Sequence, residues 1–210
     1  NVALGYRALN ANTTASNNTA VGKDALYVNT TGHNNTAVGT ASLDANLTGI
    51  ENVALGSSSL SGNTTGSENV AVGQGALFAN TTASYNTAVG KSALVTNTTG
   101  YGNTASGKDA MRLNTTGYYN SGDNTTGDNN VAVGRQALKY NTTANNNTAV
   151  GYQSLQVNTT GDTNVAVGKD SMLANTTGTN NTAVGARSLQ SNTTAANNVA
   201  VGDLALGANT

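Results

Sequence analysis

Few side chains in this 210-residue sequence have the types and spacing that catalysis requires. His33 is the only histidine, and it lies at a position that varies between neighbouring repeats, with no orienting partner evident for a general base. Asp24, Asp109 and Asp170 each follow a lysine, but they are too far apart along the chain to work together as an acid and a base. We therefore expect exposed lysine–aspartate contacts, no enzyme activity and no cofactor.

A single acidic stretch could bind a metal ion. Asp123 and Asp128 flank Asn124, and carboxylate and amide oxygens are calcium ligands. The spacing is not that of a known calcium loop, so Asp123 and Asp128 are weak candidates only.

The phrase Asn-Thr-Thr recurs along the whole chain and satisfies the acceptor pattern for N-glycosylation. In a sequence so rich in Asn and Thr, the simpler interpretation is a turn in which equivalent residues stack into ladders. Stacked Thr columns would also make a flat hydroxyl array that could order water, so ice binding is a competing interpretation. The candidate glycosylation sites are Asn12, Asn29, Asn63, Asn80, Asn97, Asn114, Asn124, Asn141, Asn158, Asn175 and Asn192.

The composition excludes several partners. Only 9% of the residues are charged, the net charge is -1, and the basic and acidic residues are scattered singly along the sequence, so we expect no nucleic-acid partner. Cysteine is absent, which is compatible with an extracellular protein that folds without disulfides. No apolar run approaches the ~18 residues of a membrane span, so we predict no membrane segment in this chain.

The chain is organised by one repeat, exemplified by Asn18-Thr19-Ala20-Val21-Gly22 and returning every 17 residues. We number each repeat from this asparagine, so that Asn18 is position 1 and Gly22 is position 5. Glycine and Asn-Thr residues recur so often that no segment has the apolar spacing of a helix. At positions 2 to 4, in contrast, the side chains alternate between two faces as they do in a short strand.

One such unit cannot fold alone, because it buries too few apolar side chains. Stacked units can fold, since each strand then pairs with the coils above and below. The sequence therefore predicts an all-β parallel solenoid of about twelve 17-residue coils, roughly 55–60 Å long, with like residues over like. The predicted ladders include Asn18, Ala20, Gly22, Asn35, Ala37, Gly39, Asn69, Ala71 and Gly73.

Three ladder positions carry specific expectations. Asparagine at position 1 is expected at a tight corner, where Asn tolerates a left-handed backbone. Glycine at position 5 is expected at the next corner, where a side chain would clash or φ is positive. Position 3 is alanine in every copy from Ala3 to Ala200, which implies close approach of the opposite wall of the coil or of a neighbouring chain.

One repeat is longer than the others, because Asn103 and Asn130 are 27 residues apart and not 17. We interpret 118–127 as a loop that bulges from an irregular coil at 103–129, with the ladder continuing through Asn130. Residues 1–210 are otherwise a single repeat array. The array begins directly at position 1 and stops at Thr210, position 13 of the last repeat, without capping units, and we expect it to be a fragment of a longer fibre.

Aromatic side chains gather at variable corners in the middle third of the chain. On an exposed corner they could stack on sugars or contact a neighbouring chain; alternatively, they could cover the apolar edge of the coil beneath. These residues are Phe78, Tyr85, Tyr101, Tyr118 and Tyr119.

The phrases Asn52-Val53-Ala54-Leu55-Gly56 and Asn69-Val70-Ala71-Val72-Gly73 resemble the repeats of YadA-like heads (Hep/Hag repeats) of trimeric autotransporter adhesins. The longer unit A-V-G-x-x-A-L-x-x-N-T-T-G is similar to repeat tracts of phage tail fibres and bacterial surface proteins. The resemblance implies a left-handed β-roll, a homotrimer, and attachment to a host cell or matrix at a cell or virion surface. It also implies that positions 2 and 4 face the core, leaving the alanine ladder for close packing.

These observations together predict an extracellular structural and adhesive fibre segment. Its expected partners are copies of itself and a host receptor or glycan. The alternative is a single-chain solenoid that forms a filament, or that binds ice or carbohydrate through a flat polar face.

Overall fold

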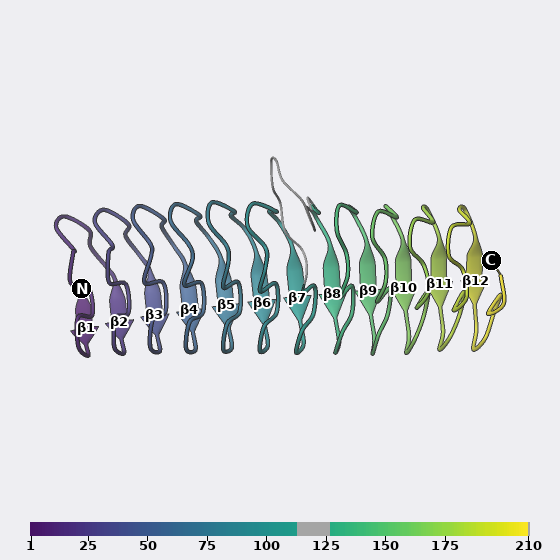
Figure 1. The fold of residues 1–210 in the computed structure, drawn as a ribbon, viewed down its shortest axis with the longest axis horizontal. Coiled ribbons are helices and arrows are strands. Elements are labelled where there is room, and N and C mark those ends of the chain that lie inside the picture. The colour runs from purple at the N-terminus through teal and green to yellow at the C-terminus, as the bar shows by residue number, and fades with distance from the viewer. Residues whose placement is uncertain (113–126, 210) are drawn as a thin grey trace.

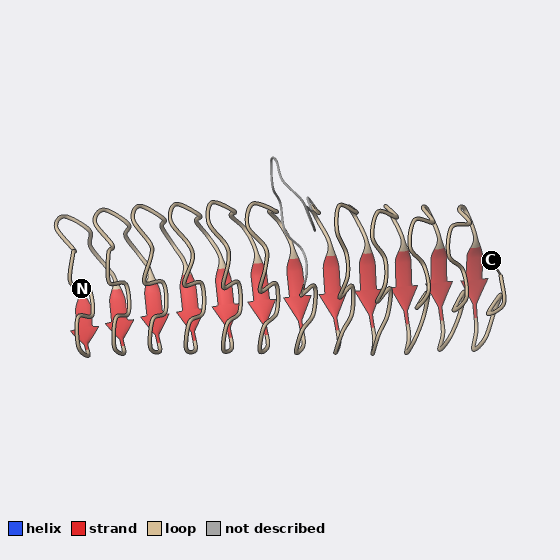
Figure 2. Cartoon of the chain, viewed as in Figure 1, coloured by secondary structure: helices blue, strands red, loops and turns tan. Residues whose placement is uncertain are grey.

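The computed structural model describes residues 1–112 and 127–209, and the regular elements in these ranges are short β-strands (Figures 1 and 2). Each strand occupies positions 2 to 4 of a repeat. The strands are β1 (Val2–Leu4), β2 (Thr19–Val21), β3 (Thr36–Val38), β4 (Val53–Leu55), β5 (Val70–Val72), β6 (Thr87–Val89), β7 (Thr104–Ser106), β8 (Val131–Val133), β9 (Thr148–Val150), β10 (Val165–Val167), β11 (Thr182–Val184) and β12 (Val199–Val201).

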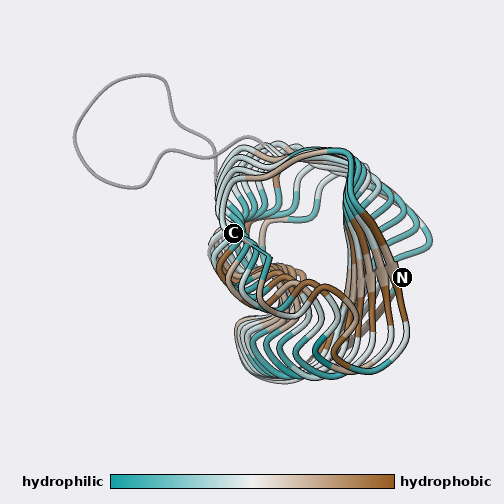
Figure 3. Ribbon diagram, turned by 90° about the vertical axis from the view of Figure 1, so that its right-hand side faces the viewer, coloured by the Kyte–Doolittle hydropathy of each residue, from teal (hydrophilic) through white to brown (hydrophobic). Residues whose placement is uncertain are grey.

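The strands form one parallel 12-stranded sheet in sequence order, from β1 to β12. Equivalent residues pair, so that Thr19 lies beside Thr36 and Ala20 beside Ala37. Figure 1 shows the coils stacked side by side into an elongated rod, and Figure 3 looks along that stack. The predicted parallel β-solenoid is thus confirmed, with about eleven turns and about 17 residues between successive strands.

The segments between strands are hydrogen-bonded from coil to coil as well. The backbone N–H of Leu26 donates to Ser42 O at 3.0 Å, and that of Asp24 donates to Tyr6 O at 2.9 Å. Backbone groups of the turns therefore find partners in the neighbouring coils, as buried backbone must. This explains how a coil with a single three-residue strand can stack stably.

The alternation of the strand was predicted correctly, but its direction was wrong. Ala20 and its equivalents from Ala37 to Ala183 face inward and are fully buried, whereas Val38 and Val89 at position 4 are 38% and 41% exposed. The reason is the narrow cross-section of the coil: Ser154 Oγ, on the opposite wall, donates to the carbonyl oxygen of Ala166 at 2.9 Å. The opposite wall therefore lies close to position 3, which favours a side chain as small as alanine.

The hydrophobic core is a stack of small side chains around one larger one. Position 3 contributes alanine and position 8 alanine or serine, while position 9 contributes leucine or methionine from the facing wall. Leu60 and Met111, both at position 9, are fully buried. Each coil buries little apolar surface alone, and the core exists only because neighbouring coils cover it.

The left-handed corners lie at positions 7, 9 and 17, not at the position 1 asparagine as expected. Asn34 has φ 60° and Glu51 has φ 58°, whereas Asn18 and Asn35 are not among the described residues with positive φ. The asparagine column serves a buried hydrogen-bonding role instead. At position 9, Leu60 has φ 53°, a conformation that β-branched residues avoid, which explains why this position holds Leu or Met and never Val or Ile.

Glycine at position 5 behaves as expected. Gly73 has φ +130°, and a Cβ placed on it would lie 2.6 Å from both the carbonyl carbon and the carbonyl oxygen of Gly90. Both the backbone conformation and the contact with the next coil therefore require glycine.

The irregular coil does not interrupt the sheet. β7 pairs with β8 in the usual register, with Ala105 beside Ala132, and the N–H of Thr104 donates to Asn130 O at 2.9 Å. The ladder continues through Asn130 as predicted. Residues 118–126 of the predicted loop lie outside the described residues.

Candidate functional site

The outward face of the sheet is the most continuous candidate binding surface. It is formed by positions 2 and 4 of all twelve strands, where every side chain is Val, Thr, Leu or Ser. Residues in the middle of the array, such as Leu55 and Val133, are 37% and 39% exposed. We call these two columns the sheet face. Its strands are three residues long and stack in register, and it carries no charge.

Two buried asparagine columns line the interior beside the apolar core. At position 1, Asn52 accepts the backbone N–H of Asn69 on its side-chain oxygen, at 3.0 Å. At position 12, Asn63 Nδ2 donates to Asn46 Oδ1 at 2.8 Å. The carbonyl oxygen of Gly66 joins the two columns, because it accepts from both Asn52 Nδ2 (2.9 Å) and Asn63 Nδ2 (2.8 Å).

This geometry bears directly on the Asn-Thr-Thr sites. Asn63 is fully buried and both hydrogens of its Nδ2, the atom that a glycan would modify, are engaged in hydrogen bonds. The same burial holds for Asn29, Asn80, Asn97, Asn141, Asn158, Asn175 and Asn192. In the folded chain these amides form a ladder and are closed to a modifying enzyme. Asn12 is half-buried, and Asn114 and Asn124 lie outside the described residues.

The sequence contains further N-glycosylation acceptor patterns outside the Asn-Thr-Thr phrase. At several position 17 sites the chain reads Asn-Asn-Thr, in which the first asparagine is followed two residues later by threonine. All four of these first asparagines are exposed, and they are Asn17, Asn34, Asn146 and Asn180. A scan for the general pattern would have found them.

The two Thr columns differ in role. At position 13, Thr64 Oγ1 donates to the backbone oxygen of Thr81 at 3.0 Å, and Thr159 Oγ1 donates to that of Thr176 at 2.9 Å, so these hydroxyls support the stack. At position 14, side chains such as Thr65 are exposed. The exposed array is therefore one hydroxyl wide, narrower than the two-column surface expected.

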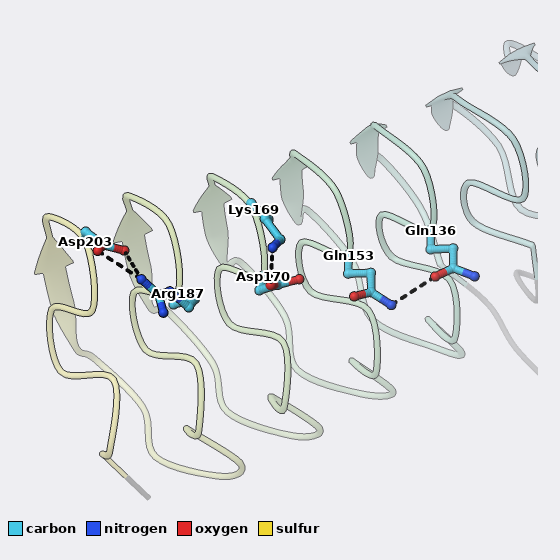
Figure 4. Close-up of polar contacts among 6 residues, drawn as sticks. All are labelled: Gln136, Gln153, Lys169, Asp170, Arg187 and Asp203. Atoms are coloured by element: carbon cyan, nitrogen blue, oxygen red, sulfur yellow. Dashed lines mark hydrogen bonds and ion pairs between the residues drawn. The ribbon is translucent and has the colours of Figure 1, made fainter.

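Positions 6, 7 and 10 form a charged edge on the rod, part of which is shown in Figure 4. The predicted lysine–aspartate contacts are present: Lys23 to Asp24 at 3.8 Å, Lys108 to Asp109 at 3.5 Å, and Lys169 to Asp170 at 3.7 Å. Their lysines are well exposed, so each contact contributes little to stability.

A further pair on this edge links successive coils. Arg7 Nε donates to Asp24 Oδ1 at 2.6 Å, and the guanidinium also lies over the rings of Tyr6 and Tyr27, at 5.1 and 4.7 Å. The hydrogen bond from Arg7 lowers the pKa of Asp24, and the same contact raises the pKa of Arg7. The Arg7 side chain is exposed and that of Asp24 is partly buried, so water still reaches the pair, which positions the side chains and adds little stability.

The remaining predicted residues are not brought together into a chemical site. His33 is exposed, and no group of three or more His, Asp or Glu side chains among the described residues could hold a metal ion. Asp128 Oδ1 accepts the backbone N–H of Tyr101 at 3.3 Å, a structural use of that carboxylate. Asp123 and Asn124 lie outside the described residues.

Three of the predicted aromatic residues are exposed. Tyr85, Tyr101 and Phe78 are 59%, 51% and 45% exposed, and they therefore do not seal the coil beneath. Tyr118 and Tyr119 lie outside the described residues. The exposed rings are available for contact with a partner.

The fold defines the chain as a parallel β-solenoid repeat protein. Comparisons with protein-family models, curated proteins and solved structures found no match to it. Within residues 1–112 and 127–209 there is no helix with the length and apolar character needed to cross a membrane.

Proposed function

We propose that this chain is a structural and adhesive segment of an extracellular surface fibre, and that it associates as a homotrimer through the sheet face. The observation that carries the proposal is the uncharged, largely apolar surface that runs the length of the rod. Side chains on the solvent-facing side of a β-sheet are normally polar, whereas most of those on this face are Val or Leu, and only the remainder are Thr or Ser.

The size of the sheet face supports an interaction role. Twelve strands at a spacing of ~4.8 Å, each ~10 Å long, span roughly 550 Å². The Val and Leu share of this footprint falls within the ~300–600 Å² typical of the largest apolar patch on a monomer, and such patches are often functional. The regular repeat also suits contact with a copy of the chain, because the coils of both copies have the same axial spacing.

Sedimentation analysis of the mass in solution tests the trimer. The wild-type chain should sediment at about three times its 20.9 kDa mass. A variant with Val38→Lys, Leu55→Lys and Val89→Lys places three charges on the sheet face and should sediment as a monomer.

The matched control is Thr48→Lys, Thr65→Lys and Thr99→Lys, which adds the same charge to the same three coils at the exposed position 14. It should remain a trimer. A monomeric wild-type chain would contradict the proposal, and so would a sheet-face variant that keeps the trimer mass while its circular dichroism stays native.

The second candidate is a single-chain solenoid that forms a filament or binds ice or carbohydrate. The exposed Thr column at position 14 favours it, since hydroxyls at a regular ~4.8 Å spacing present an ordered polar edge. A monomeric wild-type chain that depresses the freezing point below the melting point would support this alternative.

A further inference from the structure

Five of the nine basic residues of the chain lie on three consecutive coils. Position 6 carries Lys91, Lys108 and Arg135, and position 10 carries Arg112 and Lys139. We call these five residues the basic patch. In the sequence they are separated by many neutral residues, but the solenoid step places equivalent positions on adjacent coils, ~4.8 Å apart.

Contacts on the charged edge show that positions 6, 7 and 10 share one surface. Asp109, at position 7, lies 3.5 Å from Lys108 Nζ and 3.9 Å from Arg112 Nε. On the following coils, Gln136 Oε1 accepts hydrogen bonds from both Gln153 Nε2 and Gln156 Nε2, at 3.0 Å each. Figure 4 shows Gln136 and Gln153 projecting to the same side of neighbouring coils. The basic patch is therefore contiguous.

The basic patch has a net positive charge that the rest of the edge lacks. Elsewhere on the edge, Arg7, Lys23, Lys169 and Arg187 each contact an aspartate. Within the patch, Asp109 is the one carboxylate that the described residues supply at positions 6, 7 and 10.

Lys91, Arg135 and Lys139 form no ion pair with any residue in the described ranges. Lys91 and Arg135 are exposed, as are the charged ends of Lys108 and Arg112. Three cations on adjacent coils that lack a carboxylate in those ranges repel one another, and an anionic ligand would relieve that repulsion.

Two tyrosines border the patch. The guanidinium of Arg135 lies 5.9 Å from the ring centre of Tyr152, and Lys139 Nζ lies 4.7 Å from that of Tyr140. Both rings are partly exposed, 39% for Tyr152 and 36% for Tyr140. Aromatic rings beside cations suit a ligand with an apolar ring face and negative substituents, such as an acidic sugar.

We propose that the basic patch binds an anionic polysaccharide, lying along the rod with its sulfate or carboxylate groups on the Lys and Arg columns. This inference rests on the adhesive part of the proposed function, for which it names the ligand class. A nucleic-acid duplex fits less well, because proteins that bind one commonly neutralise about 6–10 phosphates, whereas the patch offers five cations on a chain of net charge -1.

The test uses the whole chain immobilised on a sensor surface and three soluble probes at low salt. Heparin represents sulfated glycans, hyaluronan represents carboxylated glycans, and single-stranded DNA of similar length represents polyphosphates. The patch variant is Lys91→Gln, Lys108→Gln and Arg135→Gln. The control variant is Lys23→Gln, Lys169→Gln and Arg187→Gln, which changes the net charge by the same amount outside the patch.

The expected result is binding of heparin, hyaluronan or both by the wild-type chain. The patch variant should bind about tenfold or more weakly, because three exposed charge contacts are lost. The control variant should stay within about twofold of the wild type. Comparing the two glycans identifies whether sulfate or carboxylate is the preferred group.

Three outcomes would overturn the inference: no binding of either glycan, equal losses in both variants, or DNA binding as tight as glycan binding. Sedimentation of the same samples separates this inference from the proposed trimer. A trimer that binds no glycan would contradict the glycan site and leave the trimer proposal intact. A monomer that binds heparin through the patch would contradict the trimer and support the glycan site.

Discussion

Asn46 donates its side-chain amide to Asn29 Oδ1 at 2.8 Å, and both side chains are fully buried. A side-chain amide donates and accepts in nearly the same plane, so identical copies can satisfy each other from coil to coil. The interior of this solenoid is therefore partly polar, without unpaired amides in the described part of this column. The same relationship makes each member dependent on its neighbours.

Removing one member of the position 12 column should be costly. Asn63→Ala leaves Asn46 Oδ1 without its donor and opens a small cavity, so the free energy of unfolding should fall by roughly 2–4 kcal/mol. Urea denaturation followed by circular dichroism measures the change. Thr65→Ala, at an exposed site two residues away, should lie within ~0.5 kcal/mol of the wild type. Equal effects of the two substitutions would contradict a structural role for the ladder.

Two glycines separated by a single residue should respond very differently to the same substitution. Gly73→Ala introduces a Cβ 2.6 Å from the backbone of Gly90 at φ +130°, and should destabilise the chain by about 3 kcal/mol or more. Gly75 has φ +64° and no atom within 4 Å of the place that a Cβ would occupy, so Gly75→Ala should cost only ~1 kcal/mol. Thermal melts of the two variants compare them, and similar melting temperatures would count against the close stacking of position 5.

The backbone conformation at position 9 should override side-chain volume. Leu60→Ile conserves volume and would ordinarily cost less than ~1.5 kcal/mol, but φ 53° is unfavourable for a β-branched residue and should raise the cost to roughly 2–4 kcal/mol. Leu60→Met should be tolerated, because Met111 and Met172 occupy the same position with φ 46° and 50°. Chemical denaturation gives both values. A variant with isoleucine as stable as the one with methionine would show that strain does not select the residue.

Glycan attachment should follow burial and not the repeat phrase. When the chain is expressed in a host that performs N-glycosylation, the folded fraction should carry glycans only where the asparagine is exposed. Asn34 and Asn180 are such sites, whereas Asn63 and Asn175 are fully buried. Peptide mapping by mass spectrometry distinguishes them. Glycans on Asn63 in chains with native circular dichroism would contradict the buried ladder.

Much of the fold could be predicted because every repeat has the same pattern of residues and therefore forms the same local structure. A 17-residue step with one short alternating segment allows a stack of coils and little else, so the parallel sheet, the register of Ala20 with Ala37, and its continuation to Asn130 followed from spacing. The direction in which the strand faces did not follow. Alternation shows only that Thr19 and Val21 point away from Ala20, and both assignments satisfy the same pattern.

The sequence by itself determined the architecture, since a unit too small to bury a core must stack and identical units stack in register. Only the tertiary structure decided which side of the strand is buried, because the cross-section depends on how closely Ser154 approaches Ala166 across the coil. The structure also decided which surface residues are neighbours. Lys91, Lys108 and Arg135 are isolated charges along the chain, and they become one patch because the solenoid converts a long separation in sequence into a single strand spacing.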